Sequence, residues 1–113
     1  MENKKLTVLW TNDNVDTSKH MVLMYTKFAM LNKWFDNVTV IIWGATAKLV
    51  ATNKEIQAAI KEAEAAGVVF EACVACATNL GVLDEVKALG FKVAPMGLPL
   101  TNVLLNNEKL ITI

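Results

Sequence analysis

The feature that most constrains this chain is a regular alternation between short β-rich runs and longer segments with helical spacing. The β-rich runs are dominated by valine, isoleucine, leucine and aromatic residues, and they cover residues 6–10, 38–43, 68–73, 91–94 and 110–113. They read as nearly continuous apolar runs, which is typical of strands covered on both faces. Strict alternation of strand and helix predicts parallel strands joined by right-handed helical crossovers.

The segments between these runs predict four helices. Apolar residues recur at helical spacing, and the predicted helices span residues 16–35, 53–66, 80–89 and 101–105, with a looser segment at 45–52 and a turn at 95–99. Asn53 and Thr101 are suitable N-caps, and Gly67 and Gly90 are suitable helix stops. We therefore predict one domain over residues 1–113, a three-layer α/β/α sandwich around an open five-stranded parallel sheet.

Composition excludes several classes of partner. Eleven basic and eleven acidic residues give a formal net charge of zero, which argues against nucleic acid and against an anionic membrane surface. The longest apolar run, residues 38–47, is far shorter than the ~20 residues of a membrane span. Residues 1–5 do not resemble a signal peptide, so we expect a cytoplasmic protein. Neither glycine-rich nucleotide-binding motif occurs, and we predict no cofactor.

Candidate site residues follow the strands, because open parallel sheets place their functional groups beyond the carboxyl ends of the strands. Cys73 ends the third strand just before a helix, where backbone N–H groups and the helix dipole stabilise a thiolate. Cys76 follows one helical turn later, close enough to form a disulfide or share a metal. Asn12 and Gly97 follow the first and fourth strands, and we predict that they line a substrate pocket.

The two cysteines leave alternatives open. A free cysteine is often a small buried apolar residue, and a C-x-x-C pair serves redox proteins, metal sites and other thiol chemistry. A closed zinc site needs four ligands, and the only other usual soft ligand is His20, which we expect to face solvent. We therefore predict no metal site.

The segment around Cys73 resembles a known family. Residues 71–77, followed by Leu80, Gly81 and Val82, resemble the signature of the DsrE/DsrF-like sulfur-relay family, which includes TusD-type and YchN-like members. The resemblance continues through residues 89–93, 96–97, 99–101 and 109–113 and so covers essentially the whole chain. It implies a three-layer sheet of five parallel strands, trimeric or hexameric assembly, and a sulfur-carrying role for Cys73. Cys76 is not part of the pattern of the TusD-type members.

This resemblance implies a sulfur carrier or sulfurtransferase that works with sulfur donor and acceptor proteins. Cys73 is then the residue that holds the persulfide, which requires an accessible thiolate and little else. Two alternatives stand beside it: a thiol–disulfide redox protein in which Cys76 is the resolving thiol, and a non-catalytic oligomeric module with inert cysteines.

Composition also indicates self-association. Apolar residues make up 54% of the chain, and the mean hydropathy is +0.37. Tryptophan and methionine are enriched at interfaces, and Met24, Met30 and Trp34 broaden the apolar stripe of the first predicted helix. We expect a homotrimer or homohexamer with Cys73 near a neighbouring subunit.

Overall fold

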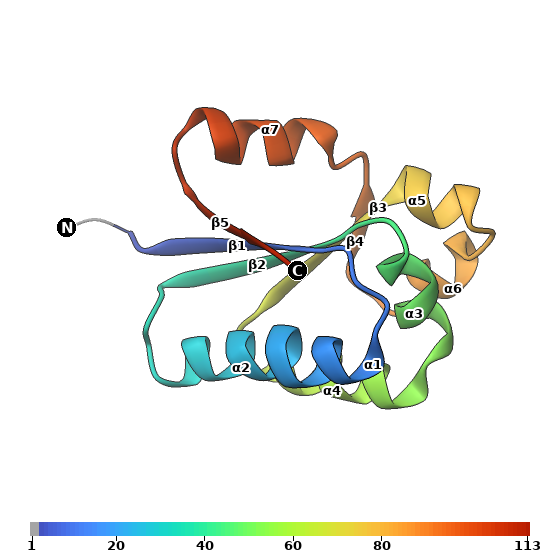
Figure 1. The fold of residues 1–113 in the computed structure, drawn as a ribbon, viewed down its shortest axis with the longest axis horizontal. Helices are drawn as coiled ribbons and strands as arrows, with labels where there is room; N and C mark the ends of the chain where they lie inside the picture. The colour runs from blue at the N-terminus through green and yellow to red at the C-terminus, as the bar shows by residue number, and fades with distance from the viewer. Residues whose placement is uncertain (1–2) are drawn as a thin grey trace.

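The sheet has the predicted all-parallel form. A computed structural model describes residues 3–113, so Met1 and Glu2 of the charged leader lie outside the described residues. The strands are β1 (Lys5–Trp10), β2 (Asn37–Ile42), β3 (Val69–Cys73), β4 (Lys92–Ala94) and β5 (Lys109–Thr112). They pair in the order β4-β3-β2-β1-β5, and every pairing is parallel, as Figure 1 shows. The predicted α/β fold class is confirmed.

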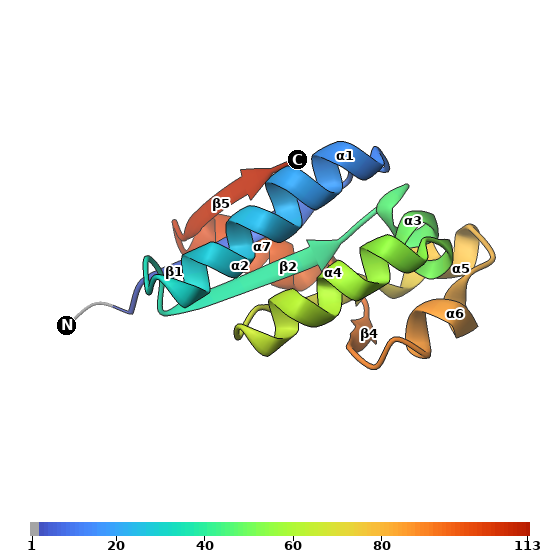
Figure 2. The same ribbon diagram turned by 90° about the horizontal axis from the view of Figure 1, so that it is seen from below.

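Helices cover the two sheet faces unequally. They are α1 (Val15–Thr17), η1 (Ser18–Leu23), α2 (Met24–Leu31), α3 (Thr46–Thr52), α4 (Lys54–Ala65), α5 (Val74–Asn79), α6 (Leu83–Lys87) and α7 (Gly97–Leu105). The continuous helical run of α1, η1 and α2 lies with α4 on one face, and α7 lies on the opposite face (Figure 1). Helices α3, α5 and α6 gather near the carboxyl ends of the central strands (Figure 2).

Strand alternation divides the apolar residues between two cores. In β1, the side chains of Leu6, Val8 and Trp10 point to the face covered by α2 and α4, where they join the main core. The Trp10 indole N–H donates a hydrogen bond to the Ser18 hydroxyl at 3.0 Å, so this large buried side chain has no unpaired donor. Leu9 points to the α7 face and belongs to a smaller second cluster.

Two predicted helices are placed differently in the structure. The first helix ends at Leu31 rather than Phe35, because Lys33 takes a positive φ of 57° and turns the chain. Trp34 therefore follows the helix, 52% exposed. The helix predicted over residues 80–89 is wrong in extent: α5 and α6 are separate, and the turn between them includes Gly81.

Two loop predictions are also wrong. The looser segment at residues 45–52 contains α3, whose Leu49 and Val50 are buried. Helix α7 begins at Gly97, so Pro99 lies in its first turn, where a missing N–H costs nothing. Thr101 is then inside the helix, and its hydroxyl donates to the Gly97 carbonyl instead of capping the helix.

The connection that carries α7 explains why this helix stands alone. The chain passes from β1 through β2 and β3 to β4 by stepping each time to the next strand in the same direction. The last connection returns across the sheet to place β5 beside β1. A right-handed return in the opposite direction must cross the opposite face, which is where α7 lies.

Candidate functional site

The site lies where the chain leaves two neighbouring strands toward opposite faces of the sheet. After β3 it enters α5 and α6, which pack with α3, and after β4 it enters α7 on the other face. Open α/β sheets bind ligands at such switch points, beyond the carboxyl ends of the strands. Cys73 is the last residue of β3 and pairs in register with Ala94, the last residue of β4. The topology therefore places this cysteine at the switch point.

Cys73 is both a strand end and a helix cap. Its extended backbone, φ −70° and ψ 115°, lets the side chain fold back over the first turn of α5. The sulfur accepts a hydrogen bond from the backbone N–H of Cys76 at 3.4 Å. Sulfur here takes the place that a serine or aspartate oxygen takes at an ordinary N-cap. The N-cap geometry therefore aims one backbone donor at the Cys73 sulfur, and thiolate character at this position remains a prediction.

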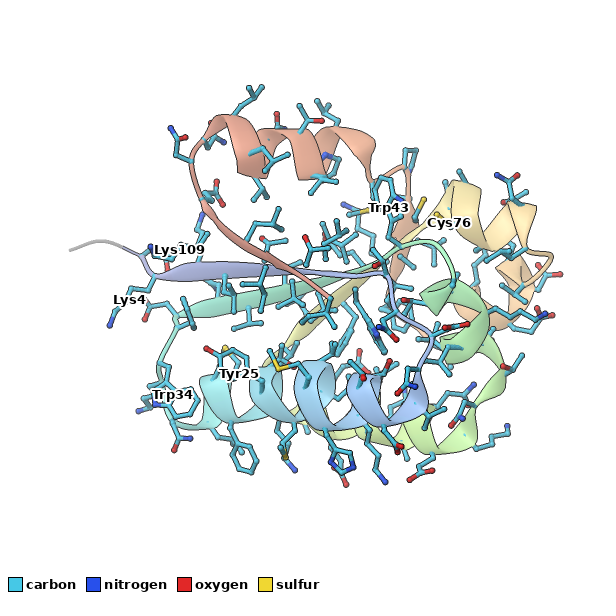
Figure 3. The ribbon with its side chains drawn as sticks, viewed as in Figure 1. Lys4, Tyr25, Trp34, Trp43, Cys76 and Lys109 are labelled. Atoms are coloured by element: carbon cyan, nitrogen blue, oxygen red, sulfur yellow. The ribbon has the colours of Figure 1, made fainter. Side chains whose placement is uncertain are left out.

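Apolar side chains enclose the Cys73 sulfur. It forms a cluster with Ile41 and Met96, and Leu9, Trp43 and Cys76 pack against that cluster. Cys73 is only 5% exposed, and Met96 only 1%. Figure 3 shows Trp43 and Cys76 together at this end of the sheet. The expectation of a freely accessible thiol is therefore wrong for this conformation, because Met96 and its neighbours cover the sulfur.

Cys76 is the outer thiol of the pair. It is half-buried and contacts both the main core and the cluster around Cys73. Burial raises the pKa of the Cys76 thiol, and the neighbouring Cys73 raises it further. The Gly44 backbone opposes this shift. Near neutral pH Cys76 is therefore a protonated thiol beside Cys73.

Sequence reasoning did not assign Gly44 to the site. Gly44 follows β2 and has a φ of +66°, a conformation that L side chains rarely adopt. The Gly44 backbone in that turn lowers the pKa of the Cys76 thiol. The signal that could have found it was its position, a glycine just beyond the carboxyl end of the strand next to the cysteine-bearing one. Met96 and Trp43 follow strands in the same way.

The other two predicted pocket residues have different surroundings. The Asn12 side chain accepts a hydrogen bond from the Asn14 backbone N–H at 2.7 Å, and its carbonyl accepts from the hydroxyls of Ser18 and Thr46. Asn12 therefore braces the loop after β1. Gly97 is exposed at the start of α7, directly after Met96. Their pocket roles remain predictions, whereas His20 is exposed, as expected.

A cavity of about 410 Å³ lies on the same face of the sheet as Cys73, beneath α7. Its walls include Thr7, Thr39 and Glu71 from three neighbouring strands and Val103 from α7. Ile41 lines this cavity and also packs against Cys73. Glu71 precedes Cys73 by two residues, so both side chains point to the same face. One end of the cavity therefore lies beside the cysteine cluster.

Two features are absent from the described part of the chain, residues 3–113. No helix in this range is long and apolar enough to cross a membrane. Nor do three or more histidine, cysteine, aspartate or glutamate side chains in this range gather closely enough to hold a metal ion.

Comparisons with known proteins agree with the observed fold. Residues 4–113 match the DsrE/DsrF-like family. A solved structure of BT1422, a conserved protein of unknown function from Bacteroides thetaiotaomicron, is 42% identical and has a TM-score of 0.94, with 98% of this chain and 96% of that chain covered. The crystal structure of the YchN protein from E. coli has a TM-score of 0.72 at 14% identity and covers 99% of this chain and 100% of that chain. Curated proteins gave no significant match.

The family match spans nearly the whole chain, and the BT1422 structure matches it closely in both sequence and fold. The chain therefore belongs to the DsrE/DsrF-like family.

Proposed function

From membership of the DsrE/DsrF-like family and the geometry of the cysteine pair, we propose that the protein carries sulfane sulfur as a persulfide on Cys73. The observation that carries the proposal is the N-cap hydrogen bond, in which the Cys76 N–H is directed at the Cys73 sulfur. The resemblance of the segment around Cys73 to the family signature implies that this residue holds the sulfur as a persulfide, and the family match spans residues 4–113. The protein is then a sulfur carrier or sulfurtransferase without a cofactor.

The proposed reaction is a pair of thiol exchanges. The Cys73 thiolate attacks the outer sulfur of a donor persulfide, the sulfur–sulfur bond of the donor breaks, and the donor thiolate leaves with the electron pair. An acceptor thiolate later attacks the outer sulfur on Cys73, and the Cys73 thiolate leaves in turn. The sulfur of Cys73 is anionic before the first step and after the second. The Cys76 N–H stabilises it at both points.

Enclosure explains how a reactive persulfide survives between the two exchanges. The cluster of Ile41, Met96 and Trp43 keeps water and oxidants from the sulfur. Methionine is flexible, so a rotation of Met96 opens the site without moving the sheet. The cavity beneath α7 reaches Ile41 and offers donor and acceptor thiols an approach along the sheet.

We also propose that the chain assembles as a homotrimer or homohexamer. Helix α7 has no fully buried residue, and its Leu98, Leu104 and Leu105 are 70%, 55% and 73% exposed. Val69, at the start of β3, is 51% exposed. Met24, from the helical stripe identified in the sequence, is 47% exposed. Such exposed apolar surface is typical of protein–protein contacts.

The chemistry fits a reducing compartment. Both cysteines are free thiols in the structure. Thiol pairs persist in this state in the cytosol, where glutathione and thioredoxin systems keep them reduced. We therefore propose a cytoplasmic protein that exchanges sulfur with partner proteins.

The test of the carrier role is mass spectrometry after anaerobic incubation with a persulfide donor. Protein with Cys76→Ala should gain one sulfur atom, and peptide mapping should place it on Cys73. The double variant with Cys73→Ser and Cys76→Ala should gain none. If a series of donors leaves the Cys76→Ala protein without an adduct, the proposal is wrong.

A further inference from the structure

Simple carriage of sulfur on Cys73 leaves the Cys76 thiol without a role. The backbone N–H of Cys76 donates to the Cys73 sulfur at 3.4 Å, and the Cys76 side chain packs against the apolar cluster that contains Cys73. A carrier needs one thiol to receive sulfur and to release it. A second thiol in contact with the first can attack any electrophilic sulfur formed there, and a C-x-x-C pair at a helix start has the spacing of redox-active pairs.

We propose that Cys76 resolves the Cys73 persulfide, releasing sulfide and closing a Cys73–Cys76 disulfide. This inference rests on the proposed function, because it begins from the persulfide. It adds a second activity to sulfur carriage, the reduction of sulfane sulfur to sulfide.

The step balances without an outside oxidant. Cys76 gives up its proton, its sulfur forms a bond to the Sγ atom of Cys73, and the bond from that Sγ to the outer sulfur breaks. The outer sulfur leaves as hydrosulfide with the bonding electron pair. It gains the two electrons that the two cysteine sulfurs lose when they form the disulfide. A dithiol reductant, of the class that takes part in thiol–disulfide exchange, then returns both cysteines to thiols.

The raised pKa of Cys76 has two opposing effects on the rate at which Cys76 attacks the persulfide. The raised pKa of Cys76 reduces its thiolate fraction about tenfold for each unit, but the greater nucleophilicity of a more basic thiolate returns about threefold per unit. Reaction within one molecule provides effective molarities of about 10⁵–10⁸ M when groups are well aligned. The advantage of contact is therefore much larger than the loss of thiolate, and Cys76 attacks the inner sulfur of the persulfide faster than a free thiol in solution does.

The packing around the two cysteines favours attack by Cys76 over attack by a thiol from solution. Cys76 is half-buried at the edge of the cluster, whereas Cys73 is 5% exposed beneath Met96. The Gly44 backbone lowers the pKa of the Cys76 thiol and so favours its thiolate at the moment of attack. An external thiol has to displace the enclosing side chains first, but Cys76 is already inside them.

The experiment follows one turnover in wild-type protein and in two variants. Reduced protein is treated anaerobically with inorganic polysulfide, desalted, and followed by sulfide detection and intact mass. Wild-type protein should release one sulfide per chain and end two hydrogens lighter than the reduced form. The Cys76→Ala protein should keep one extra sulfur and release sulfide at least about 100-fold more slowly, because it lacks the intramolecular thiol.

A control variant separates the proposed role of the Cys76 thiol from a general disturbance of α5. Thr78 is an exposed residue of the same short helix, and its hydroxyl donates to the Val74 carbonyl. Thr78→Ala perturbs α5 without touching a thiol and should release sulfide at the wild-type rate. If wild-type protein retains its extra sulfur as long as Cys76→Ala does, or if the sulfur is found on Cys76, sulfide release is refuted and carriage stands. If neither wild-type nor Cys76→Ala protein gains sulfur at any time, the proposed function itself fails.

Discussion

Substitution of Gly44 should destabilise the protein through backbone conformation alone. Gly44 has a φ of +66°, and a Cβ atom built there meets nothing within 4 Å. Alanine at this position therefore has room but must adopt the left-handed region, which costs about 1–2 kcal/mol. We expect Gly44→Ala to lower the free energy of unfolding by that amount.

The matched control is Gly97, a second glycine near the site with open space around it. A Cβ atom at Gly97 also meets nothing within 4 Å, but this residue begins α7 without a positive φ. Gly97→Ala should therefore stabilise the protein by about 0.5 kcal/mol, because alanine restricts the unfolded chain. The two substitutions add the same methyl group and should act in opposite directions.

Thermal unfolding measures both effects. With about 2.1 cal/mol/K of unfolding entropy per residue, a chain of 113 residues has about 0.24 kcal/mol/K in total. Gly44→Ala should then lower Tm by about 4–8 °C, and Gly97→Ala should raise it by about 2 °C. An unchanged Tm in Gly44→Ala would refute the positive φ assigned to this turn after β2.

Three further predictions test the pair, the core and the assembly. The rate of Cys76 alkylation, followed by site-resolved mass spectrometry, should keep rising above the pH range of an ordinary thiol, because burial and then Cys73 raise the pKa of Cys76. In Cys73→Ala the midpoint of this pH–rate curve should move to lower pH, and an unmoved midpoint contradicts the effect of Cys73 on Cys76. Ser18→Ala should destabilise the protein by about 1–3 kcal/mol in denaturant melts, because it leaves the buried Trp10 N–H unpaired, and a second change to Trp10→Phe should recover part of that loss. Leu105→Glu places a charge on the exposed apolar surface of α7, so light scattering should show a mass that falls from that of a trimer or hexamer toward 12.4 kDa at unchanged helix content. Wild-type protein that measures 12.4 kDa at every concentration would contradict self-assembly.

The fold was predictable because its signals are local and repeated. Each strand is a short apolar run, and alternation with helices permits few arrangements besides a parallel sheet. The helix boundaries were less predictable. In α7, Pro99 suggested a turn, yet the first turn of a helix accepts proline because its N–H groups lack helical partners anyway. In the segment after β3, apolar spacing alone could not show that Gly81 separates two short helices.

Only the part of the site that lies at the end of β3 was predictable from the sequence. Cys73 could be found because strand, cysteine and helix follow each other directly in the sequence. Its enclosure depends on Trp43 and Met96, which follow two other strands and meet Cys73 only after the sheet has formed. The raised pKa of Cys76 depends on that same enclosure and on the neighbouring Cys73. Such effects arise from tertiary packing, so no local pattern records them.

The most direct test of the account is the mass of the Cys76→Ala protein after anaerobic treatment with a persulfide donor. This variant keeps the sulfur acceptor and removes the thiol that we propose resolves it, so the adduct should accumulate. The account predicts a gain of one sulfur atom per chain, placed on Cys73 by peptide mapping and removed by an added acceptor thiol. A protein that stays at its unmodified mass with every donor, while retaining native secondary structure and a cooperative melt, would contradict the claim that Cys73 carries sulfur.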